Sequence, residues 1–217
     1  MASVDEYAKW RGITPQRVRE LLRSGELPGR RIGSRQWIVD DAAFASRPRI
    51  GRPMSPPMAW SLIALLGGDE PVDELSPVQW SRLREYRNRV LHAGPDAPAM
   101  LSSWLRHRGE RVVYRASPED LADLAKDERL LPSGVSDSRA GISAAGTIEA
   151  WLRHFMSLEQ LVGDYLLLPD PKGQVVLHRG REHGEDRALL GMIIADLADW
   201  NGPREDARVV ELLATTR

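Results

Sequence analysis

The sequence contains no cysteine, which excludes disulfide bonds and thiolate metal sites and agrees with a reducing compartment. No apolar run approaches the roughly twenty residues of a transmembrane helix, and the first residues lack the apolar stretch of a signal peptide. We therefore expect a cytoplasmic protein without a membrane contact. The 217 residues are enough for a small domain and one larger domain.

Common catalytic and nucleotide-binding motifs are also missing. The sequence has no P-loop, no Gly-x-Gly-x-x-Gly after a strand and no Gly-x-Ser-x-Gly. Its five histidines, at positions 92, 107, 154, 178 and 183, show no spacing typical of metal ligands, and we interpret segment 178–186 as a charged surface loop. We therefore predict no enzyme activity, no catalytic residue, no cofactor and no metal site.

Charge is distributed unevenly along the chain. Residues 1–53 hold eleven basic and six acidic residues, a net charge of +5, so the total of −1 leaves −6 for residues 54–217. A basic N-terminal region supplies a sequence-independent attraction to DNA phosphates. An acidic region is better suited to a protein partner or to solubility than to lying along a duplex.

The N-terminal region reads as two short helices and a hairpin. Ser3 with Glu6 forms a capping box that opens a helix ending near residue 12. Thr14-Pro15 starts a second helix, which we expect to cover residues 14–24. The strands expected at 30–32 and 35–39 are joined by a two-residue Gly33-Ser34 turn. This order predicts a winged helix-turn-helix over residues 1–46, with one helix in the major groove and the hairpin at the neighbouring groove.

The second helix separates its residues by polarity. Val18, Leu21 and Leu22 recur at helical spacing and should face the first helix. Outward arginines read guanine or bind phosphate, and glutamine reads adenine, whereas Glu20 accepts from cytosine or orients an arginine. A solvated face of mixed charge is the alternative. The predicted DNA-binding residues are Thr14, Gln16, Arg17, Arg19, Glu20, Arg23, Arg30, Arg31, Ser34, Arg35, Arg47, Arg49 and Arg52.

Residues 47–54 form a basic segment in which arginines alternate with proline and glycine. Its Gly51-Arg52-Pro53 core is similar to an AT-hook, whose extended arginine lies in a narrow A·T minor groove. A basic linker between two domains is the alternative interpretation. In both cases Arg47, Arg49 and Arg52 should add contacts to DNA.

The remaining chain predicts an α+β protein. Ser55-Pro56 and Ser76-Pro77 each open a helix, and a third is expected at about 97–107, which makes residues 55–108 a helical segment. Residues 109–217 read as a mixed α/β domain with few strands. Its strands are expected at 111–115, 148–153 and 174–178, and its helices at 117–127, 157–167, 187–200 and 203–214.

Three segments carry a resemblance to a known family: YAKWRGITPQRVR at 7–19, GELP at 25–28 and RRIGSRQWIV at 30–39. With them, residues 3–44 resemble the excisionase and MerR-type winged helix-turn-helix family. The resemblance covers about a fifth of the chain and implies DNA binding.

A second resemblance involves the larger region. GRPMSP at 51–56, AWSLIALL at 59–66, ADLA at 195–198 and GPREDA at 202–207 resemble segments of actinobacterial regulators related to the AbiE-type antitoxins. That resemblance implies a repressor of its own operon and a cognate toxin partner, which would contact the acidic C-terminal region. The chain departs from the group in its excisionase-like head.

Together these observations predict a sequence-specific, nucleoid-associated transcriptional regulator of double-stranded DNA that acts as an autorepressing antitoxin. A recombination directionality factor or phage-type architectural protein is one alternative, and a DNA-targeted enzyme is another. Because one such module reads few base pairs, we expect a homodimer or tandem sites to be needed for selectivity.

Overall fold

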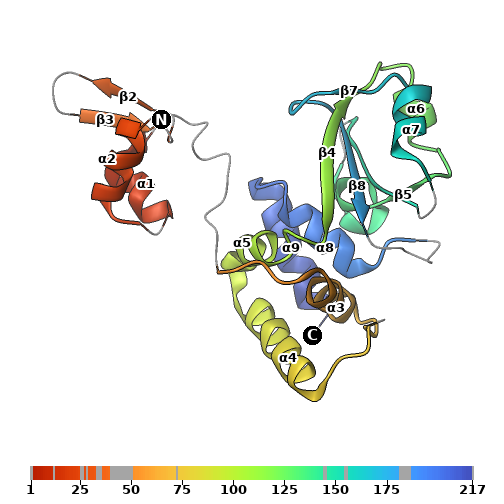
Figure 1. The fold of residues 1–217 in the computed structure, drawn as a ribbon, viewed down its shortest axis with the longest axis horizontal. Coiled ribbons are helices and arrows are strands. Elements are labelled where there is room, and N and C mark those ends of the chain that lie inside the picture. Colours follow the sequence, from red (N-terminus) through yellow and green to blue (C-terminus); the bar gives the residue numbers. More distant parts are fainter. Residues whose placement is uncertain are drawn as a thin grey trace. The chain divides into compact units, whose positions relative to one another are not determined.

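A computed structural model describes most of the chain. The described residues are 2–11, 13–24, 27, 29–32, 36–39, 51–71, 73–143, 146–153, 156–180 and 187–216. They divide into two compact units, the head (residues 1–50) and the body (residues 51–217). Each unit combines helices with a β-sheet, so the fold is mixed α+β, as predicted (Figure 1). In these ranges no helix is both long and apolar enough to cross a membrane.

The head contains two helices and a three-stranded antiparallel sheet. Its elements are β1 (Ala2–Ser3), α1 (Val4–Arg11), α2 (Pro15–Ser24), β2 (Gly29–Ile32) and β3 (Gln36–Val39), with the strands in the order β1-β3-β2. The predicted capping box is present, because the Glu6 carboxylate accepts from the Ser3 backbone at 2.7 Å while the Ser3 hydroxyl accepts from the Glu6 backbone at 3.2 Å. The hydroxyl of Thr14 likewise caps α2 by accepting from the Arg17 backbone at 3.2 Å.

The hairpin of the head differs from the prediction in its loop. Ile32 pairs with Gln36 and Gly29 with Val39, so three residues, 33–35, separate the paired strands instead of two. Val39 is fully buried, and since side chains alternate along a strand, a shift of one residue would turn it to the opposite face. Burial of Val39 therefore favours this register. Residues 33–35 themselves lie outside the described ranges.

The core of the head joins both helices to the sheet. The predicted contacts of Val18 and Leu22 with α1 are present, and Trp37 packs against the edge of this core. The buried core residues are Val4, Tyr7, Ala8, Val18, Leu22, Leu27 and Val39.

The body is built on a five-stranded mixed sheet in the order β5-β6-β8-β4-β7. The strands are β4 (Gly109–Arg115), β5 (Leu130–Pro132), β6 (Ile148–Leu152), β7 (Leu168–Pro169) and β8 (Val175–Gly180). β6 and β8 run parallel, and the other neighbours are antiparallel. The three predicted strands are confirmed as β4, β6 and β8. The edge strands β5 and β7 were not predicted, because segments of three and two residues show no measurable alternation.

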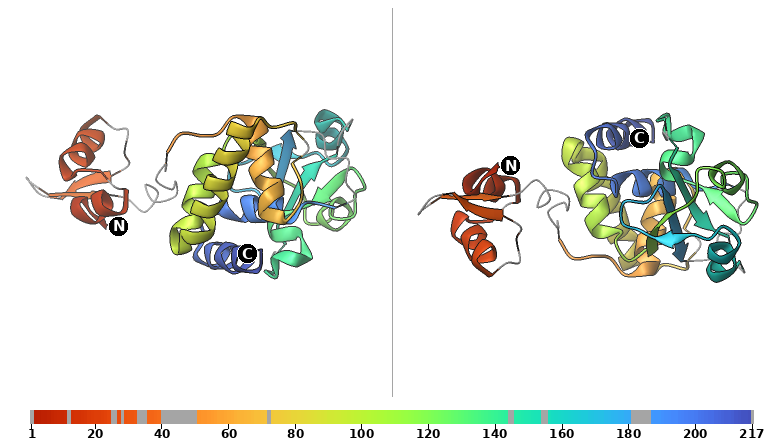
Figure 2. Two further views of the ribbon diagram at one scale, coloured as in Figure 1. Left: turned by 90° about the horizontal axis from the view of Figure 1, so that it is seen from below. Right: turned by 90° about the horizontal axis from the view of Figure 1, so that it is seen from above.

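Helices cover both faces of this sheet (Figures 1 and 2). The short helices α6 (Leu121–Leu124) and α7 (Leu158–Asp164) pack on the face formed by Ile148, Ala150 and Leu177. The other face carries Trp151, whose ring meets that of Trp60 edge-on at 5.3 Å. On this side lie α3 (Pro56–Gly67), α4 (Pro77–His92), α5 (Ala97–Trp104), α8 (Leu190–Ala198) and α9 (Pro203–Thr215), with the short 3-10 turns η2 (Gly94–Asp96), η3 (Gly134–Ser136) and η4 (Ser138–Ala140).

The Ser-Pro helix starts in the body were predicted better than the bounds of the other helices. α3 and α4 begin after Ser55 and Ser76 with proline in the first turn, as expected. The helices predicted at 117–127, 157–167 and 187–200 are instead the shorter α6, α7 and α8. α8 begins only after Leu189, whose extended backbone (φ −62°, ψ 148°) prevents an earlier start.

Asp127 ties the turn after α6 to the end of α7. Its carboxylate accepts from the Arg129 guanidinium at 2.7 Å and from the Tyr165 hydroxyl at 2.9 Å, and its side chain is 9% exposed. The hydrogen bonds from Arg129, ahead of that from Tyr165, lower the pKa of Asp127 to about 2 although partial burial opposes the shift. The native state therefore favours the ionised carboxylate more strongly than the unfolded chain does.

We predict that Asp127→Asn lowers the free energy of unfolding by about 2 kcal/mol at neutral pH. A depressed carboxyl pKa stabilises the fold above the unfolded value near 4, and this contribution is lost as the pH falls towards 2. Urea unfolding of the full chain at pH 2–7 measures the effect, and the variant should show a smaller pH dependence in the lower part of that range. Asp123→Asn, which changes an exposed carboxyl on α6, is the control. An equal loss in both variants would contradict the prediction.

Candidate functional site

The outer face of α2 consists of exposed polar residues, while Val18 and Leu22 on its inner face are buried. The amphipathic sequence of α2 causes this division, because apolar residues at positions three and four apart fall on one side of a helix. The exposed residues are Thr14 immediately before the helix, and Gln16, Arg17, Arg19, Glu20 and Arg23 within it.

Glu20 lies beside Arg17 on this face. The Arg17 guanidinium is 3.2 Å from the Glu20 carboxylate, and the two side chains are 56% and 48% exposed. Of the two roles considered for Glu20, this geometry favours the orientation of an arginine. An exposed pair of this kind contributes little to stability, so both groups remain accessible to a ligand.

The sheet register places the two hairpin arginines on opposite faces. Arg31 pairs with Trp37, and Arg30 with Ile38. Paired residues share a face, and neighbouring residues alternate, so Arg31 lies on the same side as Trp37 and Val39. That is the side on which the helices pack. Both arginines are exposed, but only Arg31 shares a face with α2.

Ser34, Arg35, Arg47 and Arg49 lie outside the described ranges. Arg52 is exposed at the start of the body. The structure therefore groups the α2 residues with Arg31, and it separates Arg30 from them.

A second cluster, which the sequence did not reveal, lies inside the body. Glu149, His178 and Asp196 are buried, and one ligand-capable atom of each lies within 4.8 Å of the others. The interpretation of segment 178–186 as a surface loop is wrong at His178, which is 2% exposed. β8 continues through Gly180 between β4 and β6, and its pairing with β6 places His178 beside Trp151, on the face that carries α3 and α8. Residues 181–186 are not among those described.

Glu149 is held by donors from three different segments. One carboxylate oxygen lies 2.9 Å from Nε2 of His178. The other accepts from Nε1 of Trp200 at 2.7 Å and from the backbone of Val135 at 3.0 Å. The imidazole of His178 also stacks on the indole of Trp151, with ring centres 4.9 Å apart.

Asp196 on α8 is held in the same way. Its Oδ1 accepts from Arg108 at 2.8 Å, and its Oδ2 accepts from the Ser133 hydroxyl at 2.5 Å and from Nε1 of Trp151 at 2.8 Å. Burial alone would raise the pKa of Asp196, but the charges of His178 and Arg108 and the hydrogen bonds from Ser133 and Arg108 lower it. The fold therefore keeps this carboxylate ionised.

Arg108 completes the cluster as a buried cation. It also donates to Asp199 at 2.6 Å, and its side chain is 4% exposed. Burial opposes the charged form, yet Asp199 and Asp196 together raise the pKa of Arg108. Its Nε atom is buried and has no hydrogen-bond partner among the residues that the structure describes.

These residues fit an internal ion-pair network better than a metal site. All four oxygens of Glu149 and Asp196 already accept hydrogen bonds from the protein. A cation would displace these donors and lie close to the guanidinium of Arg108, so its binding would be opposed by charge repulsion and by lost hydrogen bonds. The network joins α8 to β6, β8 and η3.

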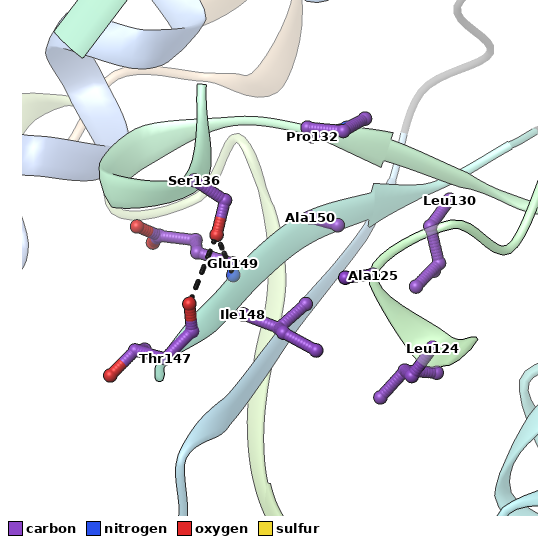
Figure 3. A pocket seen from close by; sticks show the side chains of 9 residues that line it. All are labelled: Leu124, Ala125, Leu130, Pro132, Ser136, Thr147, Ile148, Glu149 and Ala150. Atoms are coloured by element: carbon purple, nitrogen blue, oxygen red, sulfur yellow. Dashed lines mark hydrogen bonds between the residues drawn. The ribbon is translucent and has the colours of Figure 1, made fainter. Parts of the chain in front are cut away.

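A pocket of about 230 Å³ lies on the opposite face of β6 (Figure 3). Leu124, Leu130 and Ile148 line it, and the carboxylate of Glu149 points away from them. The Ser136 hydroxyl at its rim already donates to Thr147 at 3.3 Å and accepts from the Glu149 backbone at 2.7 Å. The pocket offers an apolar surface without convergent catalytic groups.

Comparisons with protein-family models, with curated proteins and with solved structures each gave no match to this chain. The two family resemblances inferred from the sequence therefore stay predictions.

Proposed function

We propose that the protein is a sequence-specific DNA-binding regulator of transcription that reads duplex DNA with the head. The observation that carries this proposal is the exposed face of α2, where Gln16, Arg17, Arg19 and Arg23 surround a single carboxylate. These side chains are the types that form bidentate hydrogen bonds with base edges and bind phosphate.

The dimensions and charge of the head support the same function. α2 has ten residues, which makes it about 15 Å long, and a helix fits the major groove of B-DNA. Arg31 shares a face with the packed helices, so it can contact the backbone beside the groove that α2 enters. The net charge of +5 on residues 1–53 adds attraction that does not depend on base sequence.

We predict that Arg17→Ala or Arg19→Ala weakens binding to a preferred duplex by about 1–3 kcal/mol, with much less effect on random DNA. The loss arises because base-edge contacts discriminate between sequences, whereas phosphate contacts do not. The measurement begins with selection of preferred sites from random duplexes by the 217-residue chain. Dissociation constants are then compared on selected and random duplexes.

Lys172→Ala, which removes an exposed cation from a turn of the body, is the matched control and should leave both affinities unchanged. Equal weakening on selected and random duplexes would show that the two arginines bind only phosphate. If the full chain selects no preferred sequence and shows no salt-dependent affinity for DNA, the proposed function is wrong.

A further inference from the structure

Three arginines of the body form a basic patch, defined as Arg52, Arg82 and Arg89. All three are exposed. Arg82 and Arg89 are seven residues apart on α4, so two turns of helix bring them to the same side. Arg52 lies at the start of the body, beside Gly51.

Trp104, at the end of α5, contacts both Arg89 and the chain next to Arg52. The Arg89 guanidinium lies over the Trp104 indole, 5.0 Å from the ring centre, and Tyr86 packs edge-on against the same ring. On the other side, Gly51 adopts a φ of +81°, and a Cβ there would lie 3.1 Å from Nε1 of Trp104. The Met54 backbone donates to the Trp104 carbonyl at 2.9 Å. The chain that arrives from the head is therefore anchored beside Arg89.

The arginines of the patch differ from several other arginines at the surface of the body. Arg115, Arg129, Arg179, Arg204 and Arg208 each form an ion pair with a carboxylate. Arg52, Arg82 and Arg89 form none with the residues that the structure describes. Glu85 lies between Arg82 and Arg89 on α4 and offsets one of the three charges. The patch therefore keeps a net positive charge that attracts an anionic ligand.

The length of chain between the two units limits how far the patch can lie from bound DNA. Twelve peptide steps connect Val39 in the head to Gly51 in the body, and they span at most about 40 Å. At about 3.4 Å per base pair, this distance corresponds to roughly twelve base pairs of duplex. DNA bound by the head therefore stays within reach of the patch.

We infer that this patch binds the phosphate backbone of the same duplex, beside the site that the head reads. The inference rests on the proposed function and extends it to the body. The patch supplies positive charge without base-reading geometry, so it adds affinity and lengthens the contacted DNA, and it leaves the preferred sequence unchanged.

The test compares the full chain with the double variant R82A/R89A on two duplexes. One duplex holds only the selected site, and the other extends it by about twelve base pairs on each side. On the long duplex we expect the slope of log K against log salt to decrease by about 2 in the variant, since each phosphate contact contributes about 0.9. Raising the salt from 50 to 200 mM should therefore reduce the affinity of the variant by a factor about ten times smaller than the factor for the unmodified chain. On the short duplex the two proteins should differ little.

Two further variants make the result specific. Arg89→Lys keeps the charge and should retain most of the slope. The double variant R115A/R179A removes two exposed arginines that already have carboxylate partners and should leave the slope unchanged. Near-ultraviolet circular dichroism confirms that each variant is folded.

The failure of this inference can be distinguished from the failure of the proposed function. If R82A/R89A keeps the full slope on the long duplex while Arg17→Ala still loses sequence preference, the patch does not bind DNA and the head does. If Arg17→Ala and Arg19→Ala have no effect on preference while R82A/R89A reduces the slope, base reading by the head is wrong. An equal decrease of the slope on both duplexes would place the contact inside the selected site and overturn the flanking position.

Discussion

Replacing Asp196 with alanine is expected to lower the free energy of unfolding of the body by about 3–5 kcal/mol. Asp196 has no exposed surface and accepts from Arg108, Ser133 and Trp151. Its removal leaves Arg108 with the more exposed Asp199 as its described ionic partner and takes a buried acceptor away from Ser133 and Trp151. Removing one partner of a buried ion pair costs several kcal/mol, because the other charge stays buried. Replacing both partners with apolar residues of similar size changes the stability much less.

Urea unfolding of the full chain, followed by near-ultraviolet circular dichroism, measures this effect. Asp164→Ala is the matched control, because Asp164 forms an ion pair with Arg129 but its side chain is 59% exposed. It should cost no more than about 1 kcal/mol. The double variant R108M/D196L removes both charges and should recover much of the stability lost in Asp196→Ala. A loss below 1 kcal/mol for Asp196→Ala would show that the buried pair does not stabilise the body.

Gly191→Ala is expected to destabilise the body by about 3 kcal/mol, although alanine is a better helix former than glycine. A Cβ at Gly191 would lie 1.8 Å from the backbone oxygen of Ile63, so α3 and α8 would have to separate. Gly67 on α3 lies at the same helix crossing, because a Cβ there would lie 3.0 Å from the Gly191 nitrogen. Small residues at this crossing allow the two backbones to touch.

Gly163→Ala provides the same substitution in a helix without this contact. No atom lies within 4 Å of a Cβ added at Gly163 in α7. We expect this variant to gain about 0.5–1 kcal/mol, because alanine restricts the unfolded chain without a steric cost in the folded state. Thermal and urea unfolding of both variants should therefore give shifts of opposite sign. A neutral Gly191→Ala variant would mean that α3 and α8 can move apart freely.

Local signals in the sequence predicted local structure well. The capping box of Ser3 and Glu6 and the Ser-Pro starts of α3 and α4 depend only on neighbouring residues, and the structure contains all of them. The hairpin loop was predicted one residue too short. Its length depends on which side chain of β3 the helices bury, and that contact is not local.

The candidate sites divide in the same way. The spacing of apolar and polar residues in α2 correctly predicted which side chains face outward, because this pattern lies within a single helix. The buried network could not be predicted, because Arg108, Glu149, His178 and Asp196 come from segments that meet only after the sheet and α8 have assembled. The basic patch was hidden for a similar reason, since Trp104 brings Arg89 to Gly51 from more than thirty positions away.

The shared use of the buried carboxylates affects how the body can open. Each of them accepts hydrogen bonds from segments far apart in the chain. If α8 alone unfolded, Arg108, Ser133 and Trp151 would lose their shared acceptor, Asp196, at the same time. Local opening at α8 therefore carries a large free-energy penalty. We therefore expect the body to unfold as one cooperative unit. A substitution that destabilises a helix beside the network should lower the stability of the whole sheet.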